Sequence, residues 1–200
     1  MPKRLGIVGP YQVEVVEYEE APLKGGQVRV RTELASGKHG TTTAMFDGAA
    51  YRGHRFDPEM HLFVEEAGAT SGTDGKTAEP HSSGTSGVGV VEEIGPEVTR
   101  WKKGDRVFGH MDVRETNTPH ADSLYALGDI APETALCIEP AYVSIHCIRE
   151  GGVRYGDSVA VVGLGAIGLI AVEMARAAGA DKVFAVDMLP NRREWAAAHG

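Results

Sequence analysis

A short apolar run that ends in a glycine-rich turn constrains this chain more than any other feature. Residues 158–168 spell Ser-Val-Ala-Val-Val-Gly-Leu-Gly-Ala-Ile-Gly, an Ala-rich stretch follows, and residues 182–187 spell Lys-Val-Phe-Ala-Val-Asp. A strand, a turn with spaced glycines, a helix and a second strand ending in an acid are typical of a nucleotide-binding βαβ unit. The sequence therefore predicts such a unit, with its helix running from about Ala166 to Ala178.

The turn and the acid together predict a dinucleotide site. Gly163 permits the tight turn, Gly165 lets the backbone approach a pyrophosphate, and Gly168 lets the helix lie close to the sheet. The helix N-terminus then offers free amide donors to the phosphates. Asp187 lies about twenty residues further on, where a carboxylate accepts the ribose hydroxyls of an adenosine and repels a 2′-phosphate, so we predict NAD rather than NADP. The expected cofactor residues are Gly163, Gly165, Ala166, Ile167, Gly168, Asp187 and Arg192.

Two alternatives to this interpretation stay open at the level of sequence. A doubly wound domain that keeps the glycine turn for packing alone would have nearly the same residues. Arg192 could pair with an adenosine phosphate, or it could be an ordinary solvated arginine.

Composition and charge exclude several classes of partner. The 200 residues include 28 acidic side chains against 20 Lys and Arg, a formal net charge of −8, and the basic residues are scattered. Binding to nucleic acid or to an anionic membrane is therefore disfavoured. No apolar run reaches the roughly eighteen residues of a membrane span, and the N-terminus has no targeting pattern. We expect a soluble, unprocessed protein that acts on a small molecule.

The chain has only two cysteines, Cys137 and Cys147. They provide neither a disulfide framework nor a cysteine zinc cage, which fits a reducing cytoplasm. Because both fall in a segment that is expected to be helical, we predict that they are buried and act as small hydrophobic residues.

Patterning predicts a β-rich region before the βαβ unit. Residues 11–34, 87–95 and 102–109 alternate polar and apolar side chains, as half-buried antiparallel strands do. Residues 35–83 are rich in Gly, Thr, Ser and Asp and predict long loops, with one short helix from about Asp57 to Glu66.

The helical signals place the domain boundary near residue 150. Pro132 begins a helical stretch that ends at Gly151 and Gly152, and a further helix begins near Pro190. We therefore expect an N-terminal domain of residues 1–150 and the first βαβ portion of a doubly wound domain in residues 151–200. A complete doubly wound domain normally has six strands, so the domain is expected to be truncated. Either the chain is a piece of a longer polypeptide, or a partner covers the open sheet edge.

Three stretches together resemble the medium-chain dehydrogenase/reductase family, in particular its polyol and threonine dehydrogenase-like branch. They are Ser-Gly-Lys-His-Gly-Thr-Thr at 36–42, Gly-Thr-Ser-Gly-Val-Gly-Val-Val-Glu-Glu-Ile-Gly at 84–95 with Lys-Gly-Asp-Arg-Val at 103–107, and Glu-Pro-Ala-Tyr-Val-Ser-Ile-His at 139–146 before the glycine turn. The resemblance covers nearly the whole chain. It implies an N-terminal GroES-like β domain, a Rossmann domain whose cleft holds substrate and nicotinamide, and assembly into homodimers or homotetramers.

The zinc ligands of the resembling family are largely replaced. Zinc-dependent members have a cysteine in Gly-x-Cys-Gly-Thr-Asp and a His-Glu pair in Gly-His-Glu-Gly, where this chain has His39, Thr85 and Ser86. A catalytic zinc needs three firm N, S or carboxylate ligands, and the resemblance leaves only His39 and Glu139. We expect no metal. Other histidines could in principle donate to zinc, but they have no i, i+4 or HExxH spacing; they are His54, His61 and His81. Residues 87–136 also lack the cysteines of a structural zinc lobe.

Without zinc, hydrogen-bond donors must polarise the carbonyl oxygen of the substrate. By the resemblance, Thr41 falls where relatives use a hydroxyl proton relay, and His39 beside it could pass the proton to solvent. Alternatively, His39 only fills the space of the missing cysteine. Glu139 matches a zinc-associated carboxylate of polyol-type relatives, or it is simply an acid at a helix start. The expected catalytic residues are His39, Thr41 and Glu139.

The resemblance and the predicted cofactor site together favour one function. We expect an NAD(H)-dependent oxidoreductase that interconverts a secondary alcohol and a ketone on a small polyol or sugar-like substrate without catalytic zinc. Two alternatives are a zinc-free enone or quinone reductase, against which Asp187 argues because such relatives generally prefer NADPH, and a non-catalytic nucleotide-binding or structural member of the family.

Overall fold

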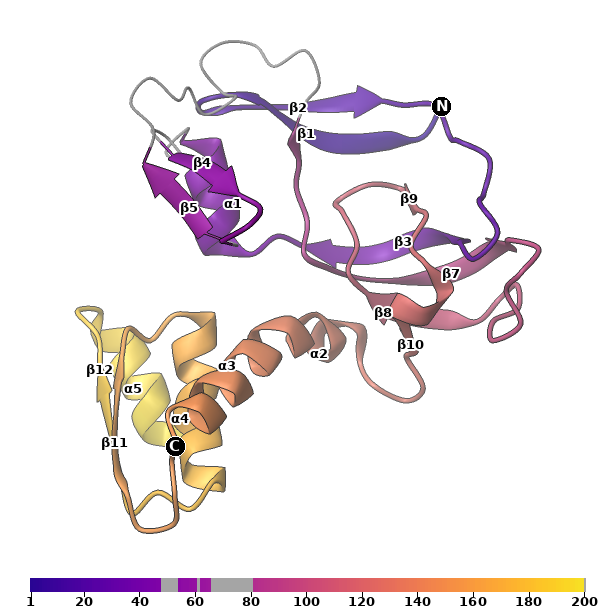
Figure 1. Ribbon diagram of the computed structural model, residues 1–200. Helices are drawn as coiled ribbons and strands as arrows, with labels where there is room; N and C mark the ends of the chain where they lie inside the picture. Colours follow the sequence, from indigo (N-terminus) through magenta and orange to yellow (C-terminus); the bar gives the residue numbers. More distant parts are fainter. Residues whose placement is uncertain (48–53, 61, 66–80, 200) are drawn as a thin grey trace. The chain divides into compact units, whose positions relative to one another are not determined.

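The computed structural model describes residues 1–47, 54–60, 62–65 and 81–199 (Figure 1). The chain forms two compact units, Met1–Leu136 and Cys137–Gly200. Within the described ranges, no helix has the length and apolar character that a membrane crossing requires.

The first unit is built mainly from antiparallel strands. A three-stranded sheet has the order β2-β1-β6, and a five-stranded sheet has the order β10-β8-β7-β3-β9. Helix α1 (His39–Phe46) follows β3, and the unit also contains a short 3-10 helix, η1 (Ala121–Ser123), and α2 (Pro132–Leu136). The strands of the two sheets are β1 (Lys3–Gly9), β2 (Gln12–Glu17), β3 (Val28–Ser36), β6 (His81–Ser82), β7 (Ser86–Ile94), β8 (Arg106–Gly109), β9 (Thr116–Asn117) and β10 (Leu124–Ala126).

Side chains of β3 alternate between the core and the outer face of the larger sheet. Val28 and Val30 are fully buried, whereas Arg29 between them forms a salt bridge of 3.0 Å with Glu93 of β7. Successive side chains of a strand point to opposite faces, so this alternation buries one face only. The core on that face contains Val28, Val30, Val91, Val98, Trp101, Val107, Met111, Ala121 and Leu124.

A tyrosine ties the segment after β2 to the larger sheet. The Tyr18 hydroxyl lies 2.9 Å from the carbonyl oxygen of Thr116 and 2.6 Å from its Oγ1, and it accepts a hydrogen bond of 3.1 Å from the Thr116 amide. The guanidinium carbon of Arg114 lies 4.1 Å from the centre of the Tyr18 ring. This buried end of the ring is therefore fully bonded, and it joins the two sheets of the unit.

The helix predicted from Asp57 to Glu66 is wrong. The described residues there form an antiparallel hairpin of β4 (His54–Asp57) and β5 (Leu62–Glu65). Oδ1 of Asp57 accepts hydrogen bonds of 2.9 Å from the amides of Glu59 and Met60. Such an Asx turn reverses the chain, so the Asp-Pro pair ends a strand here rather than beginning a helix.

The second unit contains the predicted βαβ arrangement. Strands β11 (Ser158–Val162) and β12 (Lys182–Val186) pair in parallel, from Ser158 opposite Lys182 to Val162 opposite Val186. Helix α4 (Ala166–Ala177) connects them and ends one residue before the predicted end, and α5 (Pro190–His199) begins at the expected proline. Leu164, Val172 and Ala196 form the buried core between these elements.

The compact units divide before α3 (Ile138–Glu150), whereas the boundary expected near residue 150 follows it. The helical stretch that begins at Pro132 is interrupted at Cys137, so α2 packs with the first unit and α3 with the second. Ser144 shows why α3 belongs to the second unit. It is fully buried, and its Oγ lies 2.8 Å from the carbonyl oxygen of Pro140 and 2.9 Å from that of Ile167 in α4.

Both cysteines are exposed, which contradicts the expectation that they are buried. Cys137 lies at the interruption between α2 and α3, and Cys147 lies beside an open cavity along β11. Helical periodicity placed both residues correctly near or in helices, but it does not show which face of a helix another element covers.

Gly168→Ala is predicted to destabilise the second unit. A Cβ at residue 168 would lie 1.8 Å from the carbonyl oxygen of Gly163, which is backbone and cannot rotate away. We expect a loss of about 1–3 kcal/mol or more, as for other overpacked sites, measured by chemical denaturation.

Gly40→Ala in α1 is the matched control, because a Cβ there meets no atom within 4 Å. It is expected to be neutral or stabilising, since Ala favours a helix over Gly. Equal stabilities of the two variants would contradict the predicted role of Gly168.

Candidate active and cofactor-binding sites

The expected site residues fall on both compact units. His39 and Thr41 lie on α1 in the first unit, whereas Glu139 and the glycine turn lie in the second. Glu139 is half-buried in the first turn of α3. Whether Glu139 acts together with His39 and Thr41 therefore stays a prediction.

The glycine turn has the backbone geometry that a close approach of strand and helix requires. Gly163 has a φ of +90°, which favours glycine, and its amide donates a hydrogen bond of 2.8 Å to the carbonyl of Val186. Gly165 is the N-cap of α4, and no side chain caps the amides of that helix. Gly168 leaves room for the carbonyl of Gly163. The first turn of α4 thus offers amide donors that an anion can take up.

Asp187 joins the end of β12 to the glycine turn. Its Oδ2 accepts a hydrogen bond of 2.7 Å from the Leu164 amide, and its Oδ1 accepts one of 2.8 Å from the Leu189 amide. Nη1 of Arg192 lies 3.4 Å from Oδ2. The amides of Leu189 and Leu164, and then Arg192, lower the pKa of Asp187 below its ordinary value of 3.8. The group is therefore a carboxylate at neutral pH, placed beside the turn that would hold a pyrophosphate.

These residues fit a dinucleotide cofactor. The close packing of Gly168 against the carbonyl of Gly163 and the carboxylate of Asp187 are two features of a dinucleotide-binding βαβ unit. A cavity of about 770 Å³ includes Gly163, Gly165, Ile167 and Gly168 at one end. The rest of it follows the free edge of β11 and the end of α3, so only the turn end corresponds to the nucleotide site.

In the first unit, the start of α1 lies next to the two residues that replace zinc ligands. Strands β3 and β7 pair so that Ser36 lies opposite Ser86. The Thr85 amide donates to the Ser36 carbonyl at 2.8 Å, and the Lys38 amide donates to Oγ1 of Thr85 at 3.0 Å. Helix α1 then begins at His39, and Thr41 is exposed on its first turn. The structure thus brings the start of α1 and the Thr85–Ser86 pair together.

The described donors do not fit a catalytic zinc ion. Among the residues whose side chains the structure describes, which do not include His39 or His81, no group of three or more His, Cys, Asp or Glu could hold a metal. Oγ1 of Thr85 already accepts the Lys38 amide, and Ser86 is buried. Of the alternative donors, His61 lies outside the described residues.

Two hydrogen bonds, one in each unit, were not anticipated from the sequence. The bond from Lys38 to Thr85 joins residues 47 positions apart, and the bond from Leu164 to Asp187 joins residues 23 apart. The strand-turn-helix-strand pattern placed Asp187 beside the turn, so that signal existed. No local spacing pointed to Thr85, because its role depends on the register of β3 and β7.

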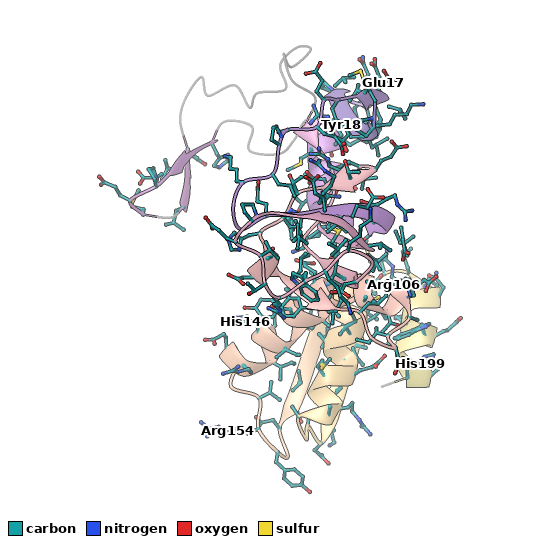
Figure 2. The ribbon with its side chains drawn as sticks, turned by 90° about the vertical axis from the view of Figure 1, so that its right-hand side faces the viewer. Glu17, Tyr18, Arg106, His146, Arg154 and His199 are labelled. Atoms are coloured by element: carbon teal, nitrogen blue, oxygen red, sulfur yellow. The ribbon has the colours of Figure 1, made fainter. Side chains whose placement is uncertain are left out.

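His146 is an exposed residue of α3 and contacts two side chains of the same helix (Figure 2). Its Nε2 lies 3.2 Å from the Tyr142 hydroxyl, and its Nδ1 lies 4.0 Å from Glu150. These partners are one turn away on the same helix, so the geometry explains His146 as a residue that stabilises α3.

Comparison with known proteins agrees with this architecture. The model of the alcohol dehydrogenase GroES-like domain matches residues 24–137. The D-guloside 3-dehydrogenase of Escherichia coli K12 is 34% identical over 205 aligned positions, which cover 99% of this chain and 57% of that protein. The L-arabinitol 4-dehydrogenase of Aspergillus niger is 32% identical over 147 positions, 58% of this chain and 38% of that protein.

A solved structure shows the same fold. The 2R,3R-butanediol dehydrogenase of Bacillus subtilis superimposes with a TM-score of 0.78 at 23% identity, covering 100% of this chain and 62% of that one. This chain thus spans little more than half the length of the proteins that it matches along its whole length. The GroES-like domain, the βαβ unit and the match to a dehydrogenase along 99% of the chain confirm the resemblance in the sequence, and the chain belongs to the medium-chain dehydrogenase/reductase family.

Proposed function

We propose that the whole protein is an NAD-dependent dehydrogenase that interconverts a secondary alcohol and a ketone on a sugar or polyol, without catalytic zinc. The observation that carries the proposal is the match, along 99% of the chain, to a dehydrogenase that acts on a guloside. L-Arabinitol 4-dehydrogenase, a more distant relative, acts on a polyol. Both substrates are small and hydroxylated, which supports the same substrate class here.

The second unit supports the choice of NAD. When bound, the nicotinamide of this cofactor takes up or gives the hydride. The amides at the start of α4 would bind the pyrophosphate, and the carboxylate of Asp187 would accept the ribose hydroxyls. Arg192, 3.4 Å from that carboxylate, would hold it in place or approach the adenosine from the side. A 2′-phosphate would meet the negative charge of Asp187, which disfavours an NADPH-dependent enone reductase.

The first unit supports a proton-transfer role for α1. Thr41 is an exposed residue on the first turn of this helix, two positions after His39. In the proposed reaction, the Thr41 hydroxyl accepts the proton of the substrate alcohol as it gives its own proton to His39, and the imidazole of His39 releases a proton to solvent. By the family resemblance, Glu139 of the second unit is a third candidate catalytic residue.

Further properties of the proposal follow from the family and the composition. We infer a homodimer or homotetramer, as is usual for relatives. Both cysteines are thiols that form no disulfide with each other, which fits the reducing conditions of the cytoplasm.

Asp187→Asn is expected to weaken the preference for NADH over NADPH. The substitution removes the negative charge but keeps a side chain of the same shape, whose oxygen can still accept a hydrogen bond from a backbone amide. NADH affinity should fall by about tenfold or more, corresponding to about 1.4 kcal/mol, while NADPH affinity rises or is unchanged, as measured by fluorescence titration.

Asp181→Asn is the control, because it makes the same change at an exposed residue just before β12. If Asp187→Asn and Asp181→Asn show the same ratio of NADH to NADPH affinity, Asp187 does not select the cofactor.

The zinc-free mechanism predicts that the whole protein remains active after treatment with a chelator. Purified protein should contain less than about a tenth of an equivalent of zinc, because only two of the three ligands that such a site needs are present. The assay uses NAD with a panel of alditols and methyl glycosides. Activity that is lost on chelation and restored only by zinc would contradict this mechanism.

His39→Ala is expected to lower turnover by about a hundredfold, in the range typical of a general acid or base, while NADH affinity is unchanged. His146→Ala is the control, because His146 contacts only its own helix in the described structure. Steady-state kinetics and NADH titration of both variants check this prediction. Unchanged turnover in His39→Ala would mean that His39 serves packing alone.

A further inference from the structure

We propose that Thr85 is a positioning residue, whose hydroxyl fixes the start of α1 where zinc-dependent relatives have a metal ligand. The inference rests on the proposed function, because α1 carries His39 and Thr41. Thr85 itself contacts neither substrate nor cofactor in this role. It acts through the backbone of Lys38, the residue immediately before the helix.

Thr85 is well placed to act as a fixed anchor. Its own amide donates to the Ser36 carbonyl at 2.8 Å, and the following residue, Ser86, pairs with Ser36 in the ladder of β3 and β7. The backbone at residue 85 is therefore held by the larger sheet. From that position, Oγ1 accepts the Lys38 amide at 3.0 Å in a half-buried environment. The hydroxyl thus connects a rigid strand end to the point where the chain leaves β3.

Helix α1 needs such an anchor because its own sequence provides little to begin it. The helix has eight residues, its N-cap Lys38 makes no side-chain capping bond, and its first turn has no acid. Isolated helices of this length are unstable in water. The carbonyl of Lys38 accepts the Thr42 amide at 2.8 Å, which is the first bond of the helix. Lys38 is therefore held by Thr85 on its amide side and begins the helix on its carbonyl side.

The turn before the helix also requires close packing. A Cβ at Gly37 would lie 2.7 Å from Oγ1 of Thr42, so the chain bends tightly between β3 and α1. In such a tight turn, a shift of the Lys38 amide changes the direction in which the first helical residues leave the sheet. The bond to Thr85 therefore contributes to the positions of His39 and Thr41 at the start of α1.

The same two segments would be joined by a metal in zinc-dependent relatives. Their ligands lie at the positions of His39, Thr85 and Ser86, so coordination would hold the start of the helix against the start of β7. Here a hydrogen bond between a hydroxyl and an amide joins these segments. It has no Lewis acidity, so it can set the position of α1 but leaves the polarisation of the carbonyl to other donors.

The test compares Thr85→Val with Thr85→Ser in the whole protein. Valine has the shape of threonine but cannot accept the Lys38 amide, whereas serine keeps the hydroxyl. Tyr18→Phe is the matched control, because it removes another bonded hydroxyl of the same unit, far from α1 in sequence. The measurements are amide hydrogen exchange at residues 37–43, and kcat and KM with NAD and the best substrate of the polyol and glycoside panel.

We expect faster exchange of the Lys38 amide and a loss of about tenfold or more in kcat for Thr85→Val, since small displacements of catalytic groups are costly. KM for NAD should stay within about twofold, because the cofactor residues are untouched. Thr85→Ser should restore both exchange and kcat, and Tyr18→Phe should keep the kcat of the wild type.

Each other outcome overturns the inference in a distinguishable way. Unchanged exchange in Thr85→Val means that the hydroxyl does not hold Lys38. Faster exchange with a kcat like that of Tyr18→Phe means that the bond exists but does not position the catalytic residues, while the proposed function stands. If the wild-type protein oxidises no alcohol with NAD, the proposed function fails, and the positioning role of Thr85 in that reaction fails with it.

Discussion

The antiparallel pairing of β3 with β7 is the interaction on which the first unit depends. It joins Val28–Ser36 to Ser86–Ile94, two segments far apart in the chain, and it buries valines of both strands completely. One end of the ladder lies in the hydrophobic core. The other end, where Ser36 lies opposite Ser86, is the point at which the chain turns into α1. The same register that builds the core therefore also decides which residues lie beside the candidate catalytic helix.

The second unit depends on a different constraint, the close approach of α4 to the end of β11. This approach requires Gly168, because a larger residue would collide with the carbonyl of Gly163. It leaves the amides at the start of α4 uncapped by any side chain and places Leu164 within 2.7 Å of Asp187. Packing and electrostatics thus act on the same few residues. The hydrogen bonds that close the turn also keep Asp187 ionised, which is the property that favours NAD in the proposed function.

Replacement of the zinc ligands has a structural as well as a chemical side. In the family, a metal both polarises the reacting oxygen and holds the protein segments that surround it. The described residues of this chain do not fit that metal, and a hydroxyl at residue 85 joins two of the segments instead. In the proposed function, the chemical part of the role is assigned to residues of α1. The proposal of a zinc-free dehydrogenase and the proposal for Thr85 are therefore two consequences of the same change in sequence.

Features with a local period were predicted well from the sequence. The glycine spacing and the apolar runs predicted the βαβ unit, and α4 agrees with its predicted range to within one residue. Polar–apolar alternation predicted strands within 11–34, 87–95 and 102–109, and the structure has β2, β3, β7 and β8 there. The family resemblance, which rests on the order of several motifs, is confirmed by the comparisons. The assignment of His39, Thr41 and Glu139 to catalysis came from that resemblance and stays a prediction.

By itself, the sequence determined the fold class, the glycine turn and the acid at the end of the second strand. It did so because periods of 2 and 3.6 residues and glycine conformations are properties of neighbouring residues. Only the tertiary structure decided that Asp57 turns a hairpin, that α3 packs with the second unit, and that Thr85 holds Lys38. These outcomes depend on which face another element covers and on the register between distant strands. Bonds such as that from Lys38 to Thr85, across 47 residues, exist only once the sheet has formed.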